Sequence, residues 1–178
     1  MKNTLTTIAA SLLIAVTFSA CTVKDDLSDN GATSSLEVKL TDNPAVFSKV
    51  NIDIRAVMVN LTDDAINGWT ALSTNAGVYD LLTLQNGKDT LLAKGTLSAQ
   101  TVKQIRFVLG TDNSVEVGNL TYPLTIPSGA ESGLKINLSK DLRSAVETVV
   151  IDFDANASIH DEGNGSFTLR PVLSVRGK

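Results

Sequence analysis

The only histidine in the chain, His160, is the first residue to test for acid–base or nucleophilic chemistry. It lies beside two acidic residues in a segment that ends Gly163-Asn164-Gly165, which is typical of an exposed turn. A Ser-His-Asp site would need a serine brought to that turn, and the sequence has no Gly-x-Ser-x-Gly elbow. One histidine and one cysteine cannot supply the three protein ligands of a catalytic zinc. We expect a solvated histidine and no enzymatic activity, with a hydrolase as the alternative.

Neighbouring carboxylates offer two further kinds of chemistry. Glycoside hydrolysis uses two carboxylates at a set separation across a cleft, whereas the spacings here are common in turns and strands. Calcium needs about six to eight oxygen ligands. The segments richest in such ligands are Thr41-Asp42-Asn43, Asp63-Asp64, Asp112-Asn113 and Asp152 to Asn156. Without an EF-hand loop or a nonapeptide repeat, Asx turns and strand-end caps are the favoured interpretation, so we expect no cofactor and keep Ca²⁺ as the alternative.

The only cysteine, Cys21, follows a short leader and fits the chemistry of lipid attachment. Residues 5–18 form an apolar stretch that is shorter than the roughly 20 residues needed to span a bilayer. Two small residues precede the cysteine, as in the lipobox of bacterial prolipoproteins, although Phe18 stands where Leu is usual. We therefore predict a lipoprotein signal peptide over residues 1–20 and acylation of Cys21. The alternative is an ordinary signal peptide followed by an incidental cysteine.

Residues 21–35 are expected to contain the acylated cysteine and a flexible tether. This segment is rich in Asp, Ser, Thr, Asn and Gly and lacks aromatic side chains. Within it, Lys24, Asp25 and Asp26 resemble the lysine and acidic pair that acts as a surface-export signal in lipoproteins of Bacteroidota. The other interpretation of so short a charged run is a hydrophilic spacer. We expect a protein anchored by lipid in the outer membrane, at the cell surface or, alternatively, on the periplasmic face.

The mature chain has the size and charge of one acidic domain, which we place at residues 36–178. Removing the 20-residue leader from 178 residues leaves 158, enough to bury a core without disulfides. Because the leader contains one lysine, the mature side chains number 14 basic and 19 acidic, a net charge of −5. Nucleic acid is excluded as a partner, since phosphate binding needs a concentrated basic patch. The expected partners are the membrane, through lipid, and an unidentified protein or glycan.

Short runs that alternate apolar and polar residues dominate this domain, and this pattern predicts an all-β fold. The predicted strands are Leu36–Leu40, Val50–Val59, Gly77–Leu84, Val102–Leu109, Ser114–Val117, Leu120–Leu124, Gly133–Leu138, Val146–Phe153 and Ser166–Val175. Helical structure is limited to single turns at Ser98–Gln104, with Ser98 as N-cap, and at Lys140–Ala145. Strands about ten residues apart are typical of a sandwich or barrel. We expect a single antiparallel β-sandwich of transthyretin-like or Greek-key style.

Strand geometry assigns alternating residues to opposite faces. The even-numbered residues of 50–58 are expected in the core, whereas Asp53 and Arg55 are expected on a solvated face. Solvated cross-strand pairs are also expected from Gln104, Arg106, Asp152 and Asp154. The end of the first of these strands is apolar on both faces, which indicates a central position in its sheet. Trp69 is expected in the core rather than exposed.

Eight segments, distributed over residues 36 to about 176, carry a family resemblance. They are LTDNP (40–44), VNIDI (50–54), WTAL (69–72), NAGVYDLL (75–82), DTLLAKGTL (89–97), KQIRFVLG (103–110), YPLTIPSGAESGLKIN (122–137) and VIDFDANASI (150–159). In this order they resemble the domain of unknown function 4382 family. Members are secreted or lipid-anchored proteins of bacteria and archaea, so the resemblance implies an extracytoplasmic β domain similar to transthyretin-like sandwiches. It implies no catalytic residues.

These observations favour a non-enzymatic binding or structural module displayed on a lipid tether. Its contact surface would be the loops at one end of the sandwich or an exposed sheet face, since binding residues concentrate on such surfaces. The alternative is a carbohydrate-active enzyme or a glycan-binding accessory lipoprotein. Sugars stack on exposed aromatic rings, and the chain offers only Trp69, Tyr79 and Tyr122 besides five Phe.

Cys21→Ala is expected to abolish lipid attachment, because the thiol is the acceptor of the lipid group. In cells fed radioactive palmitate, the unmodified chain should carry label, and the variant should be unlabelled and either unprocessed or soluble. His160→Ala, which leaves the leader intact, should label normally. Label that persists on Cys21→Ala would rule out the lipobox interpretation.

Overall fold

The computed structural model describes residues 32–64, 66–98, 100–127 and 133–177. Cys21, Lys24, Asp25 and Asp26 lie outside these residues. The described elements all belong to the compact unit Gly31–Lys178. Within the described residues, no helix is both long enough and apolar enough to cross a membrane.

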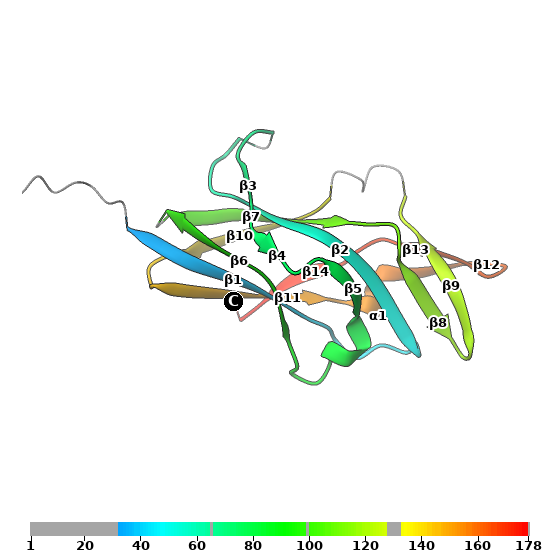
Figure 1. Cartoon of the computed structure of the whole chain (residues 1–178). Helices are drawn as coiled ribbons and strands as arrows, with labels where there is room; N and C mark the ends of the chain where they lie inside the picture. The colour runs from blue at the N-terminus through cyan, green and yellow to red at the C-terminus, as the bar shows by residue number, and fades with distance from the viewer. Residues whose placement is uncertain (1–31, 65, 99, 128–132, 178) are drawn as a thin grey trace, which may run out of the picture. The chain divides into compact units, whose positions relative to one another are not determined.

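The unit is a sandwich of two β-sheets (Figure 1). The five-stranded sheet has the order β14 (Leu173–Arg176), β11 (Val146–Phe153), β1 (Thr33–Thr41), β6 (Thr90–Ser98), β4 (Ser73–Thr74). The nine-stranded sheet has the order β10 (Leu134–Asp141), β7 (Thr101–Leu109), β2 (Lys49–Asn60), β8 (Ser114–Val117), β9 (Leu120–Thr125), β13 (Ser166–Leu169), β12 (Ile159–Gly163), with β3 (Trp69–Ala71) and β5 (Gly77–Asp80) also paired to β2. Two short turns, η1 (Leu81–Leu84) and α1 (Ala155–Ser158), are helical. The predicted all-β sandwich is confirmed.

Strand β2 is central to the larger sheet, as its apolar sequence predicted. Strands β7 and β8 follow one another along one edge of β2, and β3 and β5 along the other. The inner faces of the two sheets carry alternating residues that are fully buried, such as Leu36, Val38 and Leu40 on β1. Those of β2 begin with Val50, Ile52 and Ile54. Facing apolar layers of this kind supply most of the stability of a sandwich.

The buried face of β2 changes parity in the middle of the strand. Val50, Ile52 and Ile54 are buried, but after Ile54 the buried apolar residues of the strand are Val57 and Val59. The ladder to β7 shifts between Ile54 and Ala56, which is the signature of a β-bulge. The expectation that all even-numbered residues of 50–58 face the core is therefore right through Ile54 and wrong beyond it. One inserted residue turns every following side chain to the opposite face.

Asp53 is fully buried, so its predicted solvated position is wrong. The loop between β7 and β8 covers it: Gly110 N donates to Asp53 O at 2.8 Å, and Asn113 Oδ1 accepts from Asp53 N at 2.9 Å. Arg55 donates to Asp53 Oδ2 through Nη2 at 2.6 Å and Nε at 2.9 Å. A Cβ at Gly110 would lie 2.0 Å from Asp53 Oδ2, so only glycine lets the loop approach the carboxylate this closely. Arg55 itself is half exposed, as expected.

Several element boundaries differ from the predicted ones. Ser98 ends β6, a strand the sequence pattern did not single out, and residues 101–109 are strand, so the helical turn and its N-cap are absent there. The turn predicted at Lys140–Ala145 is also wrong, because β10 extends to Asp141 and the residues after it are not helical. The predicted strand Gly77–Leu84 ends at Asp80 and continues as η1, and Ser166–Val175 is split between β13 and β14 in different sheets.

Two strand pairs are parallel, namely β1 with β11 and β9 with β13, so the sandwich is not wholly antiparallel. Strand β1 begins at Thr33 and thus includes the last three residues of the predicted tether. The predicted hairpin at Gly118-Asn119 is confirmed: Val117 pairs with Leu120, and Gly118 has a φ of 63° that favours glycine.

At one end of the sandwich an ion pair joins the edges of the two sheets. Lys140 Nζ of β10 lies 2.7 Å from Glu147 Oε2 of β11. Glu147 shares the inward parity of Val149 and accepts further hydrogen bonds from the backbone N–H groups of Arg143 and Ser144. The Lys140 contact and these hydrogen bonds lower the pKa of Glu147 from 4.5 to about 2.

Ile52→Ala is expected to cost about 2 to 5 kcal/mol in the free energy of unfolding, because it removes a buried aliphatic group from a packed core. Asp53→Ala should cost about 1.5 to 3 kcal/mol, the range for lost hydrogen bonds to a charged group. Denaturant unfolding of both variants measures these values. The control is Asp63→Ala, which removes a carboxylate that is 90% exposed and should leave the unfolding midpoint almost unchanged. If Asp53→Ala behaves like the control, the loop does not depend on this carboxylate.

Glu147→Gln is expected to destabilise the protein near neutral pH but not in acid. The folded-state pKa of about 2 lies below the ordinary 4.5, so ionised Glu147 contributes stability that is fully present above about pH 4.5 and is lost as the pH falls towards 2. The difference in unfolding free energy between variant and wild type should shrink over this window. A difference that is independent of pH would mean that packing, rather than charge, makes Glu147 stabilising.

Candidate functional site

The outer face of the nine-stranded sheet brings together an aromatic ring, two cations and two amides. We call these five residues the platform: Trp69 on β3, Gln104 and Arg106 on β7, and Lys135 and Asn137 on β10. Their common side follows from the register, since residues paired across strands share a face. Asn60 of β2 pairs with both Trp69 and Gln104, and Gln104 with Asn137. Arg106 pairs directly with Lys135.

Arg106 is held in a defined position on this face. Its Cζ atom lies 3.8 Å from the ring centroid of Trp69, a cation–π contact, and Lys135 Nζ lies 5.8 Å from the same centroid. Gly133, which immediately precedes β10, has a φ of 87°, and a Cβ there would lie 2.8 Å from Arg106 Cγ. Glycine at 133 therefore gives the arginine stem the room to lie along the sheet.

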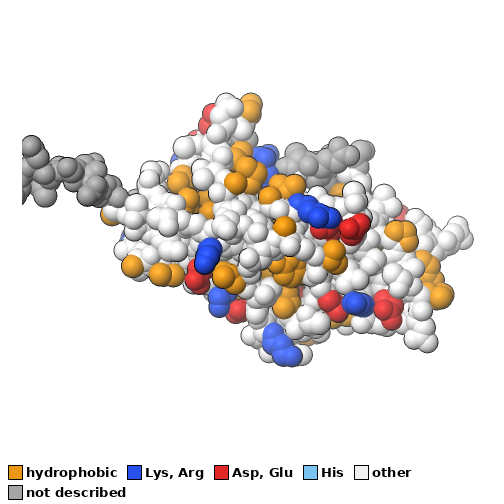
Figure 2. Space-filling view, in the orientation of Figure 1, with side chains coloured by type: hydrophobic (Ala, Val, Ile, Leu, Met, Phe, Trp, Pro, Cys, Tyr) orange, Lys and Arg blue, Asp and Glu red, His pale blue; other side chains and the backbone are white. Residues whose placement is uncertain are grey.

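The two cations have no acidic partner among the described residues. Like charges directly opposite each other on a sheet destabilise it, yet neither Arg106 nor Lys135 has a carboxylate within ion-pair distance in the described part of the chain. Arg106 Nε is also buried without a hydrogen-bond partner. Most other basic side chains lie beside acidic ones, as Figure 2 shows for the visible face of the molecule. The platform therefore concentrates positive charge on an otherwise acidic chain.

A shallow polar hollow of about 230 Å³ adjoins the platform. It is lined by Thr62, Asp63, Lys103, Gln104 and Asn137. Gln104 Nε2 donates to Asn137 Oδ1 at 2.7 Å, and Lys103 Nζ lies 2.6 Å from Asp63 Oδ2. Hydroxyl, amide, carboxylate and ammonium groups in one hollow can exchange hydrogen bonds with a polyhydroxylated ligand.

Trp69 is half-buried on this outer face, so its predicted place in the core is wrong. The sequence pattern missed the platform because β3 is only three residues long. The useful signal was the alternation within each strand, which put polar residues at 104 and 106 and at 135 and 137. This pattern indicated outer faces but did not show that β7 and β10 are neighbours.

The structure brings two of the acidic segments together but surrounds them with protein donors. Thr41 pairs with Asp152 across β1 and β11, and both Asp42 and Asp152 are buried, contrary to the solvated position predicted for Asp152. Burial raises the pKa of Asp42, and the charge of Asp152 adds to that shift. Donors that contact three of the four carboxylate oxygens are Ala155 N at 2.9 Å, Gln85 Nε2 at 3.1 Å and Arg176 Nε at 3.0 Å.

The remaining acidic segments also have local partners. Asp64 caps its own turn by accepting from Asn67 N and Ile66 N, which lowers the pKa of Asp64. Asp112 lies 3.5 Å from Arg55. Among the described residues, no three His, Cys, Asp or Glu side chains gather as a metal-binding group. His160 is exposed on β12, where it pairs with Thr168 rather than lying in a turn.

Comparisons with known proteins bear on the whole described unit. No curated protein and no solved structure matches the chain. A family model described as a domain of unknown function matches residues 33–171, from the start of β1 to two residues before β14. The chain therefore belongs to the domain of unknown function family DUF4382.

Proposed function

We propose that this chain is a non-enzymatic binding module, anchored by lipid on Cys21 outside the cytoplasm, whose platform takes an anionic ligand. The apolar leader and the small residues before Cys21 support the anchor. Lys24, Asp25 and Asp26 support display at the surface of the outer membrane, with its periplasmic face as the alternative address. A diacyl or triacyl cysteine gives the two-chain anchoring that is stable in a bilayer.

The observation that carries the binding proposal is the direct pairing of Arg106 with Lys135 without an acidic neighbour among the described residues. A sheet that needed this pair only for stability would place opposite charges there, as cross-strand pairs usually do. The Trp69 ring offsets part of the repulsion through its π face, and it also fixes the guanidinium. A bound anion would neutralise both charges, so ligand binding would explain why two cations are paired on the sheet.

Two features favour an acidic glycan as the ligand. Guanidinium groups bind carboxylate or sulfate through two parallel hydrogen bonds. The adjoining hollow offers Thr62, Gln104 and Asn137, whose hydroxyl and amide groups suit sugar hydroxyls. Nucleic acid is disfavoured, because its affinity depends on many phosphate contacts and this chain is acidic overall. We propose no catalytic step at this surface.

Binding to soluble polymers tests the proposal. In native gels that contain polygalacturonate, a carboxylate polymer, the protein should be retarded, and neutral dextran should have no such effect. An exposed ion pair contributes up to about 1 kcal/mol, so Lys135→Gln should weaken the interaction about five-fold. Arg106→Lys, which keeps the charge but loses the planar fork, should also weaken it. The matched control is Lys88→Gln, which removes an exposed charge outside the platform.

Comparing the polymers also distinguishes carboxylate-specific binding from general binding of anionic polymers. Retardation by dextran sulfate as well as polygalacturonate would assign the platform to anionic polymers in general. Equal retardation by neutral dextran, or equal losses in Lys135→Gln and Lys88→Gln, would overturn the role of the cation pair. No retardation by either anionic polymer would overturn the proposed ligand class.

A further inference from the structure

Among the described residues, half of strand β11 has a neighbouring strand on one side only. Strand β11 pairs with β1 from Val146 to Asp152. On its other side β14 pairs only with Val150–Phe153. No described strand therefore covers residues 146–149 on that side.

The register shows which backbone groups face the open side. Ser35 N donates to Ala145 O at 2.9 Å. In a parallel ladder alternate residues bond to the same neighbour, so residues 145, 147 and 149 direct their backbone groups towards β1. Val146 and Thr148 consequently direct N–H and C=O outwards, and the side chains of both are exposed. These are the donors and acceptors that another extended chain would match.

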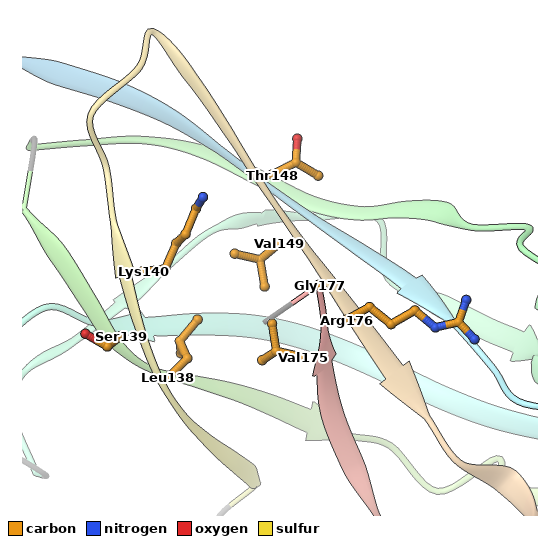
Figure 3. A pocket seen from close by; sticks show the side chains of 8 residues that line it. All are labelled: Leu138, Ser139, Lys140, Thr148, Val149, Val175, Arg176 and Gly177. Carbon is orange, nitrogen blue, oxygen red and sulfur yellow. The ribbon is translucent and has the colours of Figure 1, made fainter.

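A hollow lies beside this open edge, between the two sheets (Figure 3). Its volume is about 100 Å³, and its apolar lining comes from Leu138 on β10, Val149 on β11 and Val175 on β14. A cavity of about 150 Å³ holds a benzene ring, so this hollow has room for one aliphatic side chain. Lys140 and Arg176 lie at its rim, each paired to an acidic residue.

We propose that an extended segment of a partner protein adds to β11 as a strand in line with β14 and inserts one aliphatic side chain into the hollow. Backbone hydrogen bonds to Val146 and Thr148 would supply affinity, and the hollow would select the side chain. An antiparallel orientation is the more stable one and continues the direction of β14. This site is separate from the platform and does not depend on it.

A second copy of the chain fits this edge poorly. If two copies paired through residues 146–149, the inward-pointing side chains of the incoming copy would be Glu147 and Val149. Both already point into the interior of their own sandwich, where Glu147 is bound to Lys140. Its remaining side chains, Val146 and Thr148, point to the outer face. No aliphatic side chain would reach the hollow, so a partner with a free aliphatic residue is the occupant that the geometry favours.

Nuclear magnetic resonance of the ¹⁵N-labelled full chain in detergent micelles tests the site. The probes are five capped synthetic peptides, Thr-Thr-X-Thr-Thr, with Val, Leu, Ile, Phe or Asp as X. At least one of the Val, Leu or Ile peptides should shift the amide signals of residues 146–149 saturably, and the Asp peptide should not. A backbone N-methylated form of the same peptide loses its ladder donors and should bind about ten-fold more weakly.

A protein variant provides the matching change on the other side. Thr148→Pro removes an N–H that points to the open edge, and proline is tolerated at such edges. It should abolish the peptide-induced shifts. Thr96→Pro on β6 is not a suitable control, because it would disturb the pairing of β6 with β1. The N-methylated peptide keeps the test decisive even if Thr148→Pro unfolds. Equal binding of the N-methylated peptide, or no saturable shift with any aliphatic peptide, would overturn the proposal. Concentration-dependent shifts without peptide would assign the edge to a second copy and overturn the partner.

Discussion

The burial of Asp53 beneath the loop Gly110–Asn113 is the constraint on which the larger sheet depends. The loop is tied to β2 through both backbone groups of Asp53 and through its carboxylate, so it fixes where β7 ends and β8 begins. The same edge of β2 can then pair with two successive strands. Immediately beyond Asp53 the bulge near Arg55 reverses the faces of β2, which turns Met58 outwards and brings its neighbour Arg106 to the outer face. The platform thus lies on the face that the bulge assigns to Met58 and Arg106.

Local alternation was sufficient to predict most strands and the central position of β2, because a strand with one buried face must repeat every two residues. It could not locate the bulge, since the shift depends on pairing with residues about 50 positions further along the chain. The prediction that Asp53 is solvated failed for a related reason. Gly110 covers Asp53, and no residue near Asp53 in the sequence indicates that contact. The platform required knowing that β3, β2, β7 and β10 lie side by side, which alternation alone does not determine.

The acidic segments that suggested a calcium site also depend on contacts between residues far apart in the sequence. Asp42 and Asp152 are adjacent because β1 and β11 run parallel, a pairing of segments more than 100 residues apart. Each buried carboxylate would be costly without hydrogen bonds or an opposite charge. Gln85 and Ala155 donate to Asp42, and Arg176 donates to Asp152, so side chains and backbone from three other segments lower that cost. The residue types indicated a cluster of oxygen ligands, but donors from distant segments occupy most of these oxygens in the structure.

The contrast between these acids and the platform is the strongest reason to treat the platform as functional. Asp53 on β2 and Glu147 and Asp152 on β11 each have a cation within 3.0 Å. Arg106 and Lys135 face each other across a ladder and both lie near the same aromatic ring, without an ion-pair partner among the described residues. Replacing Lys135 with an acid would convert repulsion into attraction at the cost of one substitution. Among the described residues these three acids are paired with cations whereas Arg106 and Lys135 are not paired with acids, and the proposed anionic ligand would account for that contrast.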